Sequence, residues 1–128
     1  MDDYANNIGI DIVEYDEFVI VAVEGEVDLS AAPLFEESLA IAGATDAPAI
    51  IVDVDRVSFM DSAGVHVLLQ FAVSDTNRDR LSLTPGSPQV RRLLDITGVR
   101  GYLSFLRVPA PVCNGDEPPA ARLRLTGP

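Results

Sequence analysis

A serine lies among small residues in the segment Asp61-Ser62-Ala63-Gly64, where a polar stretch leads into a predicted helix. A serine at a helix N-cap ordinarily accepts a hydrogen bond from a backbone N–H two or three residues further on. A hydroxyl between small residues is also open to a protein kinase, and the positive end of the helix dipole tolerates the charge of a phosphate. Residue types and spacing therefore leave two interpretations open, a simple helix cap or a phosphorylation site.

Other chemistry has little support in the sequence. The chain contains one histidine, His66, and one cysteine, Cys113, so we expect neither an internal disulfide nor a zinc site of the usual ligands. The glycine-rich nucleotide motifs GxxxxGK[ST] and GxGxxG are absent. A hydrolase with Ser62 as nucleophile would need a base and an oxyanion hole, and the histidine follows it by four residues on the same predicted helix. The sequence thus favours a binding protein over an enzyme and predicts no catalytic residue, cofactor or metal.

Acidic residues outnumber basic ones and gather in the N-terminal half. The 128-residue chain carries 20 Asp and Glu against 9 Arg, a net charge of −11, and residues 1–61 alone contribute −14. This balance argues against binding to nucleic acid or to an anionic membrane. The acidic half is either a solvated surface or a face offered to a basic protein partner. No apolar run approaches the about 20 residues of a membrane span and no secretory signal is visible, so we expect a cytoplasmic protein without direct membrane insertion.

The elements that must position Ser62 alternate between strands and helices. β-Branched runs predict strands, and apolar residues at helical spacing predict helices with N-caps at Ser30, Ser62 and Ser87. The predicted order is strands at 8–14 and 18–24, a helix at 30–43, a strand at 49–54, a helix from 62 to near 77, a strand at 81–84, a helix at 87–98 and a strand at 102–106. Strands joined through helices predict an α/β fold. We expect a mostly parallel sheet of four or five strands, with the first strand antiparallel at an edge, and three main helices.

The C-terminal residues differ in composition from the rest. Residues 109–119 carry four prolines and one glycine, so they cannot pack regularly. We therefore expect one domain over residues 1–108 and a flexible C-terminal tail over residues 109–128. Whether residues 123–125 re-enter the fold stays open. Cys113 lies in this proline-rich stretch and is interpreted as a bystander thiol.

Three segments, in order along residues 8–107, resemble the STAS domain of bacterial anti-sigma-factor antagonists. They are GEVD at 25–28, VSFMDSAGV at 57–65 and VRRLLDITGV at 90–99. Each motif is short, but their order along the chain makes the resemblance specific. It implies the same α/β fold that the strand and helix order predicts.

The resemblance also implies roles for particular residues. Ser62 follows the Asp of the family's DSxG motif and would be the phosphoacceptor, and Asp28 of the GExD motif would lie near it. Asp28, Asp61, Ser62, Ala63 and Gly64 would then belong to the surface that a partner contacts. The implied partner is an anti-sigma factor of the serine-kinase type. It would bind the unphosphorylated domain and release a sigma factor, phosphorylation of Ser62 would end that binding, and a phosphatase would reset it.

The sequence departs from the family pattern at two positions. Ala63 stands where relatives often carry a second hydroxyl, so Ser62 is the acceptor that this motif offers. His66 replaces a small residue on the first turn of the helix, which bears on the identity of the partner. The alternative function within the same family is a scaffold subunit of a larger complex, either stressosome-like or associated with a transporter.

Overall fold

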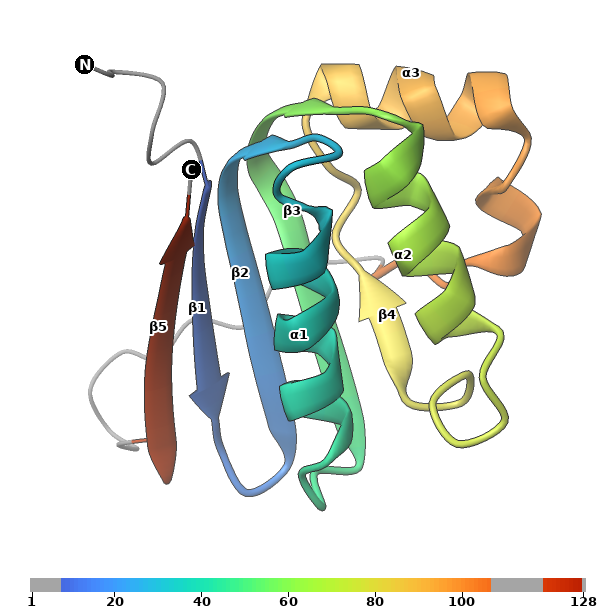
Figure 1. The fold of residues 1–128 in the computed structure, drawn as a ribbon. Coiled ribbons are helices and arrows are strands. Elements are labelled where there is room, and N and C mark those ends of the chain that lie inside the picture. The colour runs from blue at the N-terminus through green and yellow to red at the C-terminus, as the bar shows by residue number, and fades with distance from the viewer. Residues whose placement is uncertain (1–7, 107–118, 128) are drawn as a thin grey trace.

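The computed structural model describes residues 8–106 and 119–127, which form one five-stranded sheet in the order β4-β3-β2-β1-β5 (Figure 1). The elements are β1 (Ile8–Glu14), β2 (Phe18–Val27), α1 (Ala32–Gly43), β3 (Ala49–Met60), α2 (Ser62–Ala72), β4 (Leu81–Leu83), α3 (Pro88–Thr97), the 3-10 helix η1 (Arg100–Tyr102) and β5 (Ala121–Gly127). Strands β2, β3, β4 and β5 run in one direction, and β1 is antiparallel to both of its neighbours. The predicted α/β class, the mostly parallel sheet, the antiparallel direction of the first strand and the three main helices are confirmed.

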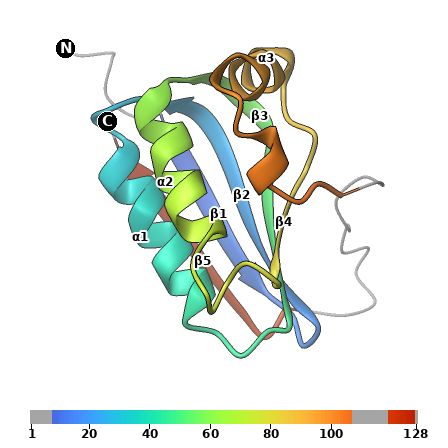
Figure 2. The same cartoon turned by 90° about the vertical axis from the view of Figure 1, so that its right-hand side faces the viewer.

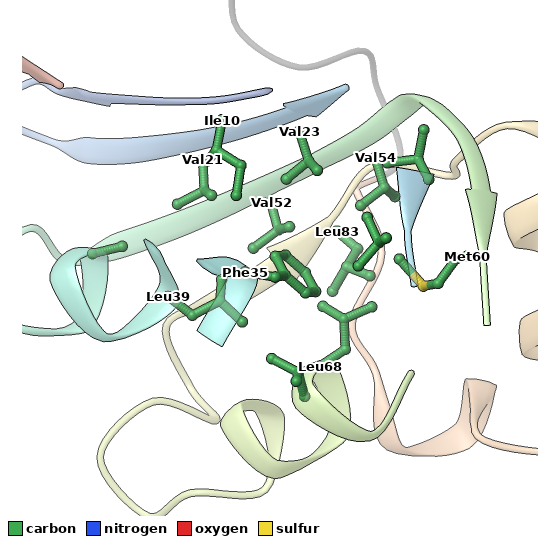
Figure 3. Close-up of a cluster of buried hydrophobic side chains, with 14 of the residues drawn as sticks. Ile10, Val21, Val23, Phe35, Leu39, Val52, Val54, Met60, Leu68 and Leu83 are labelled. Carbon is green, nitrogen blue, oxygen red and sulfur yellow. The ribbon is translucent and has the colours of Figure 1, made fainter. Parts of the chain in front are cut away.

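Helices α1 and α2 lie side by side on one face of the sheet, and α3 lies across one end of it (Figures 1 and 2). Figure 3 shows the core that fills the space between the two layers. Phe35 from α1 and Leu68 from α2 are fully buried there against Val21 and Val52 of the sheet. Burying a side chain of this size contributes about 1.5–3 kcal/mol, so this contact fixes both helices on the sheet.

Local signals in the sequence determine the bounds of α3. The Ser87 hydroxyl accepts a hydrogen bond from the Val90 N–H at 3.4 Å, and Pro88 occupies the first turn. Gly98 ends the helix with φ of 75°, a left-handed conformation that glycine adopts without steric cost. The predicted caps of this helix are confirmed.

Strand β5 corrects the prediction for the C-terminal residues. The flexible tail predicted over 109–128 is wrong for Ala121–Gly127, which pair with β1 along its whole length. The first strand is therefore an inner strand and not the predicted edge strand. Apolar and polar side chains alternate along β5, as expected of a strand with one buried face. Leu125 packs against the core, while Arg124 lies on the other face of the sheet. The remainder of the predicted tail, including Cys113, lies outside the described residues apart from 119 and 120.

Further boundaries also differ from the sequence prediction, and β3 extends to Met60 instead of ending at residue 54. Residues 102–106 form no strand, because only Phe105 makes a bridge with Leu83 and the preceding residues turn into η1. Helix α2 ends at Ala72 rather than near residue 77. The chain after it turns back on itself because the Ser74 carbonyl accepts hydrogen bonds from the next turn, including one from the Asn77 N–H at 3.1 Å.

Candidate functional site

The candidate site lies where β2 and β3 end together. Val27 ends β2 and pairs with Met60, which ends β3. The Asp61 N–H continues this pairing by donating to the Val27 carbonyl at 3.2 Å. Because the two strands are parallel, Asp28 and Asp61 leave the same end of the sheet next to each other. The register of two strands thus brings together the two motifs that the sequence singled out.

Helix α2 begins at this point with Asp61 as its N-cap. The Asp61 carboxylate accepts a hydrogen bond from the Ala63 N–H at 2.9 Å, and its carbonyl accepts the first helical bond, from the Val65 N–H. The prediction that Ser62 is the N-cap is therefore wrong, since the preceding residue takes that position. Ser62 is the first helical residue and is exposed. Among the described residues, its hydroxyl has no hydrogen-bond partner, so it is free to meet a second molecule.

The Asp28 carboxylate is fixed by the turn that leads into α1. Its Oδ1 accepts a hydrogen bond from the Ser30 hydroxyl at 2.8 Å and another from the Ala31 N–H at 3.1 Å. The Ser30 hydroxyl, followed by the backbone N–H of Ala31, holds the pKa of Asp28 below its usual value. Asp28 is therefore ionised near neutral pH. The prediction that Ser30 caps α1 is wrong, because Ala31 holds the N-cap position and Ser30 donates to Asp28 instead.

Gly64 allows the start of α2 to approach the strand ends closely. A Cβ atom at this position would lie 2.7 Å from Cγ of Met60 and 2.9 Å from Cγ1 of Val27. Real Cβ atoms do not make such short contacts, so a larger residue would push the first turn of the helix outward. Gly64 is buried, and its contribution is to hold Ser62 at the end of the sheet.

Gln89 on α3 supports the end of β3 from the other side. Strand β4 pairs with β3 only as far as Val52, so none of the described strands lies next to Met60 on that side. The Gln89 side chain takes that place, since its Oε1 accepts from the Met60 N–H at 2.9 Å and its Nε2 donates to the Met60 carbonyl at 3.1 Å. The sequence prediction missed Gln89, because nothing in its local pattern reveals a contact with a residue 29 positions earlier.

A groove between α1 and α2 opens beside Ser62. It encloses about 640 Å³, which is room for more than one side chain of a partner. Its lining includes Leu29, Pro33 and Glu36 from the α1 side and Ser62, His66 and Gln70 from α2. Leu29 is 75% exposed although it is large and apolar, so the rim offers a hydrophobic contact next to the free hydroxyl.

The structure gives no indication of a metal centre. Within residues 8–106 and 119–127, no three His, Cys, Asp or Glu side chains are grouped in a way that could hold a metal ion. None of the helices in this part of the chain has the length and apolar character that crossing a membrane requires.

The fold and the site together define a small α/β domain with an exposed serine at the start of a helix. A family model described as the STAS domain matches residues 9–109, and the chain therefore belongs to the STAS domain family. The anti-sigma-B factor antagonist of Listeria monocytogenes is 31% identical over 104 residues, which is 80% of this chain and 91% of that protein.

Solved structures show the same fold. An anti-sigma factor antagonist from Mycobacterium paratuberculosis superimposes with a TM-score of 0.71 at 24% identity, over 79% of this chain and 86% of that one. The anti-sigma factor antagonist SpoIIAA in its unphosphorylated form gives a TM-score of 0.58 at 25% identity, over 76% of this chain and 87% of that one. Strand β5 lies beyond the residues that the family model matches.

Proposed function

We propose that the protein is an anti-sigma-factor antagonist that is switched off by phosphorylation of Ser62. In this proposal the unphosphorylated form binds an anti-sigma factor of the serine-kinase type in the cytoplasm and so releases a sigma factor. A phosphatase restores the active form. Membership of the STAS family and the similarity to proteins named anti-sigma-B factor antagonists support this role. The observation that carries the proposal is the exposed Ser62 hydroxyl, which is left free because Asp61 caps the helix.

The N-cap of α2 is Asp61, whereas the proposed phosphoacceptor is Ser62. Because these are different residues, Ser62 can be modified without removing the cap of the helix. The Asp61 carboxylate accepts from the Ala63 N–H, and the Ser62 hydroxyl takes no part in that bond, so a phosphate on Ser62 need not break it. A phosphate adds a charge of about −1.5 to −2, and the N-terminus of a helix accommodates anions. The modification would therefore change the surface and leave the fold intact.

The same charge would oppose binding of the partner. Asp28 and Asp61 already place two carboxylates at this end of the sheet, and Glu36 lines the groove beside it. A phosphate in the centre of this contact would have to lose its hydration among like charges. We expect at least tenfold weaker binding of the anti-sigma factor, a difference of about 1.4 kcal/mol.

The first experiment identifies the acceptor. The protein is incubated with ATP and with each serine-kinase anti-sigma factor encoded by the same genome, and its intact mass is measured. A gain of one phosphate that Ser62→Ala abolishes supports the proposal. Ser30→Ala is the matched control, because Ser30 is also exposed near the site but its hydroxyl donates to Asp28. A phosphopeptide that maps to another residue would contradict the assignment.

The second experiment measures the switch. Calorimetric titration compares the affinity of the phosphorylated and unmodified protein for the same anti-sigma factor, and circular dichroism compares their folds. Overlaid spectra with at least tenfold weaker binding are expected. Equal affinity, or a loss of affinity that comes with unfolding, contradicts the proposal. Recovery of membrane components instead of an anti-sigma factor in a pull-down would favour the scaffold alternative.

A further inference from the structure

His66 lies one helical turn after Ser62 and faces the same groove. Both residues are exposed, and both line the groove between α1 and α2. Side chains four residues apart on a helix have Cβ atoms about 5–6 Å apart. Long side chains on a helix also point back toward its N-terminus, over the residue four positions earlier. A phosphoryl group on Ser62 would therefore lie within reach of the His66 imidazole.

Among the described residues that line the groove, the charged side chain besides His66 is acidic. His66 is the sole ionisable residue of α2, since Ser62–Ala72 contains no Asp, Glu, Lys or Arg. Glu36 faces the groove from α1, and the carboxylates of Asp28 and Asp61 stand at the strand ends. Neither lysine nor arginine is among the described residues that line the groove. Of the described residues in the groove, His66 is thus the one whose side chain can compensate the charge of a phosphate on Ser62.

We propose that His66 contacts the phosphoryl group of phosphorylated Ser62 and stabilises that state of the switch. This inference rests on the proposed phosphorylation of Ser62. A protonated imidazole donates a charge-assisted hydrogen bond to a phosphoryl oxygen. The phosphate carries up to two negative charges and three acceptor oxygens, so it offers the imidazole N–H a strong acceptor.

The test uses phosphoserine installed at position 62 during synthesis of the full chain, so that it does not depend on any kinase. The second pKa of the phosphate is measured from its ³¹P chemical shift as a function of pH. A nearby cation favours the doubly charged phosphate, so this pKa should be lower in the otherwise native protein than in His66→Gln, by about 0.3 unit for an exposed pair on one helix.

Two further variants separate a charge effect from a structural one. His66→Lys supplies a permanent cation at the same position and should lower the phosphate pKa at least as far as histidine does. The double variant Gln70→His with His66→Gln moves the imidazole one turn further along the groove. Its phosphate pKa should equal that of His66→Gln alone. Identical phosphate pKa values in the native, His66→Gln and His66→Lys proteins would overturn the inference. The absence of phosphorylation by any kinase would instead count against the proposed function alone.

Discussion

The guanidinium of Arg124 lies directly over Gly9, where any Cβ atom would collide with it. Because β1 has no side chain at this position, the arginine on β5 reaches across that strand to β2. It donates to Glu24 at 3.0 Å and to Asp11 at 2.8 Å. One side chain therefore connects the edge strand with two inner strands.

This connection predicts a pH-dependent contribution to stability. The bond from Arg124 holds the pKa of Glu24 below its ordinary value of 4.5. A carboxylate with a lowered pKa in the folded state stabilises the fold fully above its unfolded-state pKa, and this contribution fades as the pH falls through the lowered value. We expect Arg124→Gln to lower the midpoint of urea unfolding near pH 7, with a difference from the native protein that shrinks below about pH 4.5 and at high salt.

Arg122 on the same strand provides the control for this prediction. The structure gives Arg122 no ion pair with another described residue, so Arg122→Gln should leave the urea midpoint nearly unchanged over the same pH range. If the urea midpoint of Arg124→Gln differs from that of the native protein by the same amount at pH 3 and at pH 7, the ion pairs are not the cause of the difference.

Substitution of Asp28 should affect both stability and binding. Asp28→Ala removes the acceptor of the Ser30 and Ala31 hydrogen bonds, so a loss of about 0.5–2 kcal/mol in the free energy of unfolding is expected. Ser30→Ala keeps the Asp28 carboxylate and its bond from the Ala31 N–H, so it should lower the free energy of unfolding by less than Asp28→Ala does. If Asp28 also contacts the partner, calorimetry will show weaker binding for Asp28→Ala alone. A lowered melting temperature with unchanged affinity would assign Asp28 a purely structural role.

Alanine at position 64 should destabilise the domain although alanine favours helices. The gain in helix propensity of about 1 kcal/mol is opposed by the collision of the new Cβ with Met60 and Val27, for which about 1–3 kcal/mol is typical. Urea unfolding should show a net loss, and NMR should show shifts concentrated around Ser62. Gly101→Ala is the control, because a Cβ there has no neighbour within 4 Å. Unchanged stability of Gly64→Ala would mean that the helix can move away freely.

Arg80 closes the loop between α1 and β3 with its guanidinium. It donates to the carbonyls of Gly43 at 3.1 Å, Thr45 at 2.9 Å and Ala47 at 2.7 Å. Lysine cannot match the fixed fork of donors, so Arg80→Lys should lower the free energy of unfolding by about 1–3 kcal/mol in chemical denaturation. Arg78→Lys alters only an exposed pair with Asp75 and should have little effect. Equal effects of the two substitutions would contradict the role given to Arg80.

The parts of the fold that the sequence predicted well depend on local interactions. The bounds of α3 follow from Ser87, Pro88 and Gly98, all within a few residues of the helix ends. Strand β5 could not be predicted in the same way, because its pairing depends on β1, more than 100 residues earlier. The extension of β3 to Met60 could not be predicted from the sequence either. The polar residues in the second half of β3 are held in the strand by pairing with β2, and this pairing contains two irregularities of register.

The site shows the same division between local and long-range information. Sequence motifs led to Ser62 and Asp28, yet Asp and Ser are both good N-caps, so local preference could not decide between Asp61 and Ser62. The register of β2 and β3 decides it, because the Asp61 N–H bonds to Val27 and leaves the next residue to begin the helix.

The pairing of β1 with β5 places Ile8 opposite Gly127, so the two outermost described residues of the sheet are neighbours. A short linker between them, with the chain reopened at the Asp16–Glu17 turn at the far end of β2 from Val27, would give a circular permutant with the same five strands. In that chain β5 and β1 would form a local hairpin, whereas Asp11 and Arg124 are now separated by 113 positions. The permutation would make the pairing of β5 with β1 local, and at the same time it would make the pairing of β1 with β2 long-range. The edge hairpin should then form early, and its docking onto β2 should become the late step of folding.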